Sequence, residues 1–225
     1  MQERSRILWL LPSIFALGFG IHVHSNSGAH AEEHQPQSVL ILLDCSSSMK
    51  QVFSNKESRM EVAKRLVARF ATELPPSINL GLRVFGYGKS DDRFMDCRYS
   101  ALLIPLGQGN RRSLIEKIRN ISANGQSPIA FALTQALEND LSGITGRRTV
   151  VLICDGGDSC EEDAPAIVQK VRNAHKDVTY KVVSLVPKGY AFDLKAVQAV
   201  ADAAGGEVYS PESISELIKY IAPPR

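Results

Sequence analysis

The sequence predicts an α/β protein in which a mainly parallel, doubly wound sheet of about six strands carries helices on both faces. Three observations support this fold class. Strand-like apolar runs alternate with helix-like segments along residues 38–221. The runs at 38–44 and 148–155 are almost continuously apolar, as is typical of strands buried on both faces. No internal repeat or long low-complexity tract interrupts the alternation, so we expect a single domain.

The first 31 residues have the pattern of a secretory signal peptide. Arg4 and Arg6 precede an apolar run at 7–21, and the small-x-small triplet Ala29-His30-Ala31 follows. We expect cleavage after Ala31 and a product in the periplasm or outside the cell. An uncleaved membrane anchor stays open, although the run is short for a spanning helix, which needs about 20 residues. The expected mature chain has a linker, the domain and a tail, at 32–37, 38–221 and 222–225.

The first half of the domain is expected to begin with the strand 38–44. Val62, Leu66 and Phe70 recur at helical spacing and predict a helix over 59–74, which Pro75-Pro76 ends. Strands are expected at 79–86 and 100–106, and Pro105 in the second one suggests a sheet edge or a strand end.

The second half continues the alternation and includes a helix over 127–141. Ser127 is expected at the N-cap of this helix and Pro128 in its first turn. The other expected elements are the helices 111–121, 164–175, 192–204 and 213–221 and the strands 148–155, 178–186 and 207–210.

The charge of the exported part is close to neutral. Without Arg4, Arg6 and Glu3, 24 basic and 23 acidic residues remain, which gives a formal net charge of +1. Such a domain has no general electrostatic attraction for nucleic acid.

Polar side chains follow two of the buried strands at the point where each strand ends. Asp44, Ser46 and Ser48 alternate just after the first strand, and Asp155 follows the strand that begins at 148. Ligands of open α/β sheets bind at the carboxyl ends of strands, where the strand order reverses. With the hydroxyl of Ser127, these side chains offer the oxygen ligands that Mg²⁺ prefers. A cation held by few charged ligands would seek an anionic ligand from outside.

These residues resemble the motifs of von Willebrand factor A-type (vWA) domains that carry a metal-ion-dependent adhesion site, in a bacterial exported form. The family's Asp-x-Ser-x-Ser falls on "DCSSSM" at 44–49, its Gly-x-Thr-Pro threonine on Ser127 in "GQSPIAFAL", and its second aspartate on Asp155 in "VVLICDGGD". The three motifs occur in the family's order, and the resemblance covers roughly 38–221. Ser127 departs from the family's threonine, because it keeps the hydroxyl but lacks the methyl group.

The resemblance implies a Mg²⁺ or Mn²⁺ ion at the top of the sheet, held by Asp44, Ser46, Ser48, Ser127 and Asp155. It also implies that the first and fourth core strands are neighbours, and that a partner protein binds through an Asp or Glu carboxylate. The function expected is that of a binding module and not of an enzyme.

Two other functions stay open at this point. Ser47 and Lys50 fit a Ser-x-x-Lys pattern, which would suggest a serine hydrolase, but no Lys-Thr-Gly follows and no histidine lies in a matching loop. Alternatively, the domain is structural and its metal site vestigial, since Ser and Asp residues also cap helices and turns without any metal.

All four cysteines lie in the expected exported part, where disulfides are the default. Spacing alone cannot choose among the three possible pairings. Exported bacterial relatives with a cysteine in each of two corresponding loops suggest a Cys97–Cys160 bridge. Cys45 and Cys154 each adjoin one of the two aspartates; they could form a bridge, but two small buried apolar residues is the favoured interpretation.

Acidic residues are concentrated in the segment "DGGDSCEEDAP" at 155–165. Acids at the start of a helix complement its dipole, and we favour this interpretation for the helix 164–175. A rim that tunes partner docking is the alternative.

Overall fold

The computed structural model describes residues 35–88, 92–161 and 163–222. The predicted signal peptide and the cleavage point after Ala31 therefore lie outside the described residues. Within those residues, no helix is long and apolar enough to cross a membrane.

The core of the fold is a six-stranded sheet with the order β5-β4-β1-β6-β7-β8. All neighbouring strands are parallel except β5, which pairs with β4 in the antiparallel sense at one edge. This confirms the predicted mainly parallel sheet and the edge position that Pro105 suggested. The strands are β1 (Gln37–Asp44), β4 (Asn79–Phe85), β5 (Ser100–Gly107), β6 (Arg147–Cys154), β7 (Val178–Ser184) and β8 (Glu207–Tyr209).

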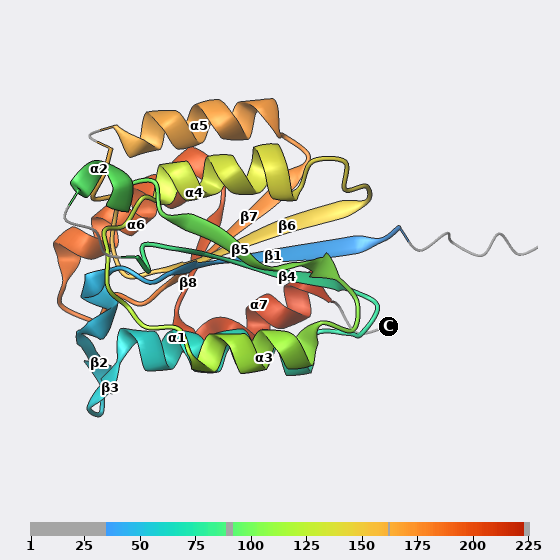
Figure 1. The fold of residues 1–225 in the computed structure, drawn as a ribbon, viewed down its shortest axis with the longest axis horizontal. Coiled ribbons are helices and arrows are strands. Elements are labelled where there is room, and N and C mark those ends of the chain that lie inside the picture. The colour runs from blue at the N-terminus through green and yellow to red at the C-terminus, as the bar shows by residue number, and fades with distance from the viewer. Residues whose placement is uncertain (1–34, 89–91, 162, 223–225) are drawn as a thin grey trace, which may run out of the picture. The chain divides into compact units, whose positions relative to one another are not determined.

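Helices cover both faces of the sheet, as Figure 1 shows. One face carries α1 (Arg59–Glu73), α3 (Arg111–Arg119) and α7 (Ile214–Ile221). The other face carries α4 (Ile129–Gln135), α5 (Ala164–Ala174) and α6 (Ala191–Ala204). Alternate side chains of β1 enter the two cores, with Ile41 in one and Leu42 in the other, both fully buried. This two-sided burial explains why the sequence of β1 is continuously apolar.

Several short elements were not expected from the sequence. Among them is a hairpin of β2 (Val52–Ser54) and β3 (Glu57–Ser58), whose turn residues Asn55 and Lys56 have φ angles of 47° and 68°. Two successive positive φ angles are typical of hairpin turns that usually contain an Asn-Gly pair. Because Lys56 stands where the glycine is usual, the sequence does not indicate this turn. The others are η1 (Ser47–Lys50), α2 (Arg93–Asp96) and η3 (Pro211–Ser213), whereas η2 (Ala136–Asp140) lies within the expected helix 127–141.

The predicted N-cap role of Ser127 is wrong. Helix α4 begins at Ile129, Pro128 occupies the cap position, and no side chain caps the helix there. The expected helix over 127–141 is divided into α4 and the π-helical η2. The hydroxyl of Ser127 is instead donated to Asp44, on a different segment of the chain. A tertiary contact has replaced the local one.

The strand order reverses beside β1. The chain passes from β1 to β4 on one side, and later returns to place β6 on the other side. Leu43 pairs with Ile153, so β1 and β6 end at the same edge of the sheet. The first and fourth core strands are therefore neighbours, as expected, and ligand sites of open α/β sheets lie at such a reversal.

Candidate metal site

Asp44 is the last residue of β1 and its side chain is completely buried. Its Oδ1 accepts a hydrogen bond from the backbone N–H of Ser46 at 2.7 Å. An aspartate that bonds to the backbone two residues later forms a local turn. This turn directs the chain from the strand into η1, which contains Ser48.

The loop before α4 is held against this turn by backbone contacts. The N–H of Ser47 donates to the carbonyl of Gly125, and the N–H of Gly125 donates to the carbonyl of Gly86, both at 2.8 Å. A Cβ on Gly125 would lie 2.3 Å from the carbonyl oxygen of Gly88, and one on Gly86, whose φ is +67°, would lie 2.0 Å from that of Gln126. The close approach of these loops therefore requires glycine at both positions.

Hydrogen bonds connect all five predicted ligand residues. The hydroxyl of Ser127 donates to Asp44 Oδ2 at 2.9 Å. The hydroxyls of Ser46 and Ser48 lie 3.0 Å apart, and that of Ser48 donates to Asp155 Oδ1 at 2.8 Å. Together with the bond from Ser46 N–H to Asp44, these contacts form one continuous network from three separate chain segments.

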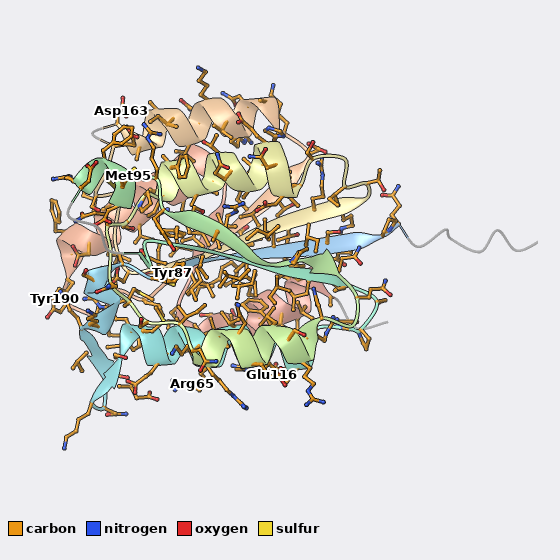
Figure 2. The ribbon with its side chains drawn as sticks, viewed as in Figure 1. Arg65, Tyr87, Met95, Glu116, Asp163 and Tyr190 are labelled. Atoms are coloured by element: carbon orange, nitrogen blue, oxygen red, sulfur yellow. A yellow bond between two sulfur atoms is a disulfide. The ribbon has the colours of Figure 1, made fainter. Side chains whose placement is uncertain are left out.

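Four of the five residues line an open pocket of about 360 Å³ at this end of the sheet, namely Ser46, Ser48, Ser127 and Asp155. Asp44 is not part of the pocket wall and lies beneath it. Figure 2 shows Tyr190, which precedes α6, at the same end of the molecule as η1. Water or a ligand can thus reach the hydroxyls and one carboxylate directly, while the second carboxylate acts from below.

The buried position of Asp44 perturbs its carboxyl group. Burial, followed by the nearby negative charge of Asp155, raises the pKa of Asp44 to about 7. Hydrogen bonds from Ser46 and Ser127 act in the opposite direction but are weaker causes. A cation at this point would offset both the desolvation and the repulsion.

Arg59, the first residue of α1, is a member of the site that sequence reasoning missed. Its Nη1 donates to Asp155 Oδ2 at 2.7 Å, and the side chains are only 2% and 3% exposed. The one available signal was a basic residue in the first turn of a predicted helix, where the helix dipole disfavours a positive charge. That signal does not identify the partner, which lies 96 residues away.

The donor set fits a hard divalent cation. Carboxylates and hydroxyls are oxygen ligands of the type that Mg²⁺ and Mn²⁺ accept. In the part of the chain that the structure describes, no three His, Cys, Asp or Glu side chains gather as a possible metal site. None of the five predicted ligand residues is a cysteine or a histidine, so they do not resemble a zinc site of the Cys and His type. They would hold a metal with two charged ligands and three neutral ones.

The acidic segment after β6 has two separate roles. Asp163 is the N-cap of α5 and accepts from the N–H of Ala166, which confirms the helix-start interpretation for this residue. Asp158 instead accepts from the N–H groups of Cys160 and Ala130, at 2.7 and 2.8 Å. Since Ala130 lies in the first turn of α4, Asp158 connects the loop after β6 to the helix that follows Ser127.

A disulfide between Cys97 and Cys160 joins the C-terminal end of α2 to the same loop. The next residue back, Ser159, accepts a hydrogen bond at its hydroxyl from the backbone N–H of Ser127, at 2.8 Å. The disulfide thus lies one residue from a direct support of the site. Cys45 and Cys154 are free and buried, in the cores on opposite faces of the sheet, which agrees with the favoured interpretation.

The geometry gives little support to a serine nucleophile. The hydroxyl of Ser47 donates to the carbonyl oxygens of Asn124 and Gly125, at 2.8 and 3.1 Å, and not to a base. Lys50 is exposed, with its Nζ 3.4 Å from the side chain of Asn124. A serine nucleophile needs a base such as histidine beside it, whereas His175 follows the C-terminal end of α5.

Comparison with known proteins identifies the family. The model of the von Willebrand factor type A domain matches residues 39–157, which is more than half of the chain. The chain is also 30% identical over 193 residues to the uncharacterized protein YwmD of Bacillus subtilis (strain 168), covering 83% of this chain and 84% of that protein. The chain therefore belongs to the von Willebrand factor type A domain family.

Solved structures of low sequence identity share the fold. A von Willebrand factor type A protein from Catenulispora acidiphila has a TM-score of 0.63 at 19% identity, covering 83% of this chain and 42% of its own. Proximal thread matrix protein 1 from the mussel byssus, solved with zinc in its MIDAS (metal-ion-dependent adhesion site) motif, has a TM-score of 0.59 at 18% identity. The match covers 83% of this chain and 47% of that one. The manganese-loaded TRAP protein of Plasmodium vivax has a TM-score of 0.59 at 18% identity, and the match covers 83% of this chain and 73% of that one. The chain thus spans less than half of the first two structures.

Proposed function

We propose that this vWA domain is an exported, metal-dependent protein-binding module. A Mg²⁺ or Mn²⁺ ion is held by Asp44, Ser46, Ser48, Ser127 and Asp155, and an Asp or Glu carboxylate of a partner protein completes its coordination. When bound, the metal supplies a Lewis-acidic position for that carboxylate. The protein side chains hold the ligand oxygens in place and fix the direction from which the partner approaches.

The observation that carries this proposal is the convergence of five oxygen-bearing side chains in one hydrogen-bonded network beneath an open pocket. Local roles do not account for it, because Ser127 and Asp155 are bonded to residues 83 and 107 positions away. A set of independent helix caps and turns would not converge in this way. The pocket leaves space above the hydroxyls for a ligand from another molecule.

The comparisons add support at the level of the family. vWA domains typically act as protein–protein interaction modules. Two proteins of the same fold have been solved with zinc in the MIDAS motif or loaded with manganese. Metal binding by the present chain and its carboxylate partner are our inference from its own side chains.

Export is part of the proposal. The signal-peptide pattern of residues 1–31 would direct the chain across the membrane, with cleavage after Ala31. The Cys97–Cys160 disulfide is consistent with an oxidising compartment such as the periplasm or the exterior of the cell.

Isothermal titration with Mg²⁺ and Mn²⁺ tests the metal site. We expect saturable binding to the wild type and its loss in Asp44→Asn, which removes a charge with little change in shape. Asp163→Asn, which changes an exposed acid at the start of α5, serves as the matched control and should bind as the wild type does. Wild-type protein that takes up neither ion would contradict the proposal.

The partner and the competing activity need separate experiments. Capture of an envelope protein by the wild type, lost with chelator and lost in Asp44→Asn, would support the binding function. Covalent labelling of Ser47 by a fluorophosphonate probe would support the serine hydrolase instead.

A further inference from the structure

Arg59 is an unusual residue to find at a cation site. It lines the pocket, its side chain is 2% exposed, and its Nη1 donates to Asp155 Oδ2. The guanidinium also lies over the ring of Tyr190, 5.8 Å from its centroid. A positive charge here is buried and close to the N-terminal end of α1, and both circumstances are unfavourable for a cation.

A second buried ion pair shows what a purely structural arginine looks like in this fold. Arg83 of β4 uses Nε and Nη2 for the two carboxylate oxygens of Asp140, and Nη1 for the hydroxyl of Ser100. Arg59, in contrast, has a buried Nε without a hydrogen-bond partner among the described residues. Among the described residues Arg111 and Arg148 also have buried nitrogens without a hydrogen-bond partner, so what distinguishes Arg59 is that its buried ion pair lines the pocket.

The buried charges around the pocket can be counted. Asp44, Asp155 and Arg59 are each at least nine-tenths buried. Asp193 also lines the pocket but is partly exposed, so water and salt screen its charge. With both carboxylates ionised, two buried negative charges balance a divalent cation. The guanidinium then leaves one uncompensated positive charge on a side chain that is only 2% exposed, which is unfavourable unless an anion arrives.

We propose that Arg59 is the specificity-determining residue that makes this metal site a receptor for an anionic group, by preventing Asp44 and Asp155 from neutralising the ion alone. The inference rests on the proposed function and deepens it, because it assigns the requirement for a carboxylate partner to one side chain of this domain. It also predicts that the site binds bare cations less tightly than its two carboxylates would allow.

Titration with Mn²⁺ alone compares the wild type with Arg59→Gln, Arg59→Lys and Arg83→Gln. Arg59→Gln keeps a hydrogen-bond donor but removes the charge, so we expect Mn²⁺ affinity to rise by at least about tenfold. Arg59→Lys keeps the charge and should stay within about threefold of the wild type. Arg83→Gln removes another buried arginine and should lower thermal stability without changing Mn²⁺ affinity. Unchanged or weaker Mn²⁺ binding by Arg59→Gln, with wild-type binding intact, overturns the inference.

A measurement on the wild type keeps the test valid if Arg59→Gln does not fold. Sodium acetate is compared with sodium chloride at equal ionic strength while free Mn²⁺ is measured. Acetate is expected to tighten Mn²⁺ binding to the wild type and to Arg83→Gln, because its carboxylate neutralises the surplus charge. Equal Mn²⁺ affinity in the two salts overturns the inference, whereas a wild type that binds no Mn²⁺ at all refutes the proposed function itself.

Discussion

Removing the Cys97–Cys160 disulfide should destabilise the domain strongly, because the bridge closes a long loop. The paired cysteines are 63 residues apart, and the closed segment contains β5, α3, α4 and β6. In the chain-entropy model, a cross-link stabilises the native state by restricting the unfolded chain, and its effect grows with the logarithm of the loop length.

For a loop of this length the model gives about 4 kcal/mol at 25 °C. In a domain of this size, 1 kcal/mol changes the melting temperature by about 2–4 °C, so a fall of roughly 8–16 °C is expected. The free energy of unfolding should fall by the same 4 kcal/mol or somewhat less, since the unfolded chain keeps some residual structure.

The assay is urea unfolding of the wild type and of the Cys97→Ser/Cys160→Ser variant, each with and without a reductant. Reductant should lower the midpoint for the wild type to that of the variant and leave the variant unchanged. A difference below about 1 kcal/mol between oxidised and reduced wild type would refute the loop-closure reasoning, which predicts several times more.

Two further predictions concern the loops and the free thiols. Gly125→Ala should weaken Mn²⁺ binding and reduce the free energy of unfolding by about 1–3 kcal/mol, because its Cβ would meet the carbonyl of Gly88 and push away the loop with Ser127. Titration calorimetry measures the change in binding and urea unfolding the change in stability. Wild-type values in both experiments would contradict the steric argument. Burial raises the pKa of the Cys45 and Cys154 thiols. A thiol reagent should therefore modify neither cysteine in the native protein and both after denaturation. Rapid labelling of the folded protein would show that the core is open.

The fold could be predicted from the sequence to the extent that its signals are local. The strand 38–44 is recognisable because β1 is buried on both faces, and Pro105 marks β5 as an edge strand because proline cannot donate to a sheet. The hairpin of β2 and β3 was missed because it lacks the local sequence signal of a hairpin turn: Asn55 and Lys56 adopt positive φ angles without a glycine.

The site could be predicted only as far as a motif marks it. Asp44, Ser46 and Ser48 stand out because they alternate directly after a strand, and Ser127 and Asp155 because they fall in the family's order. Arg59 has no motif, and its role depends on a contact across 96 residues. Asp158, as one of the acids of the segment 155–165, was expected to complement the dipole of the helix that follows it. It instead accepts a hydrogen bond from the N–H of Ala130 in α4, which precedes it by 28 residues. Contacts of this kind follow from the packing of loops and not from local preference.

The arrangement of these contacts explains how the chain holds together the five side chains of the proposed cation site. The pairing of β1 with β6 fixes Asp44 and Asp155 at one edge of the sheet. Ser127 and Ser48 then donate to those carboxylates, and Arg59 supplies a positive charge against Asp155. Because each ligand oxygen is already positioned by the sheet or by another ligand residue, little conformational entropy remains to be lost on binding. Preorganisation of this kind suits a recognition site, since the free energy of binding is then available for contacts with the partner.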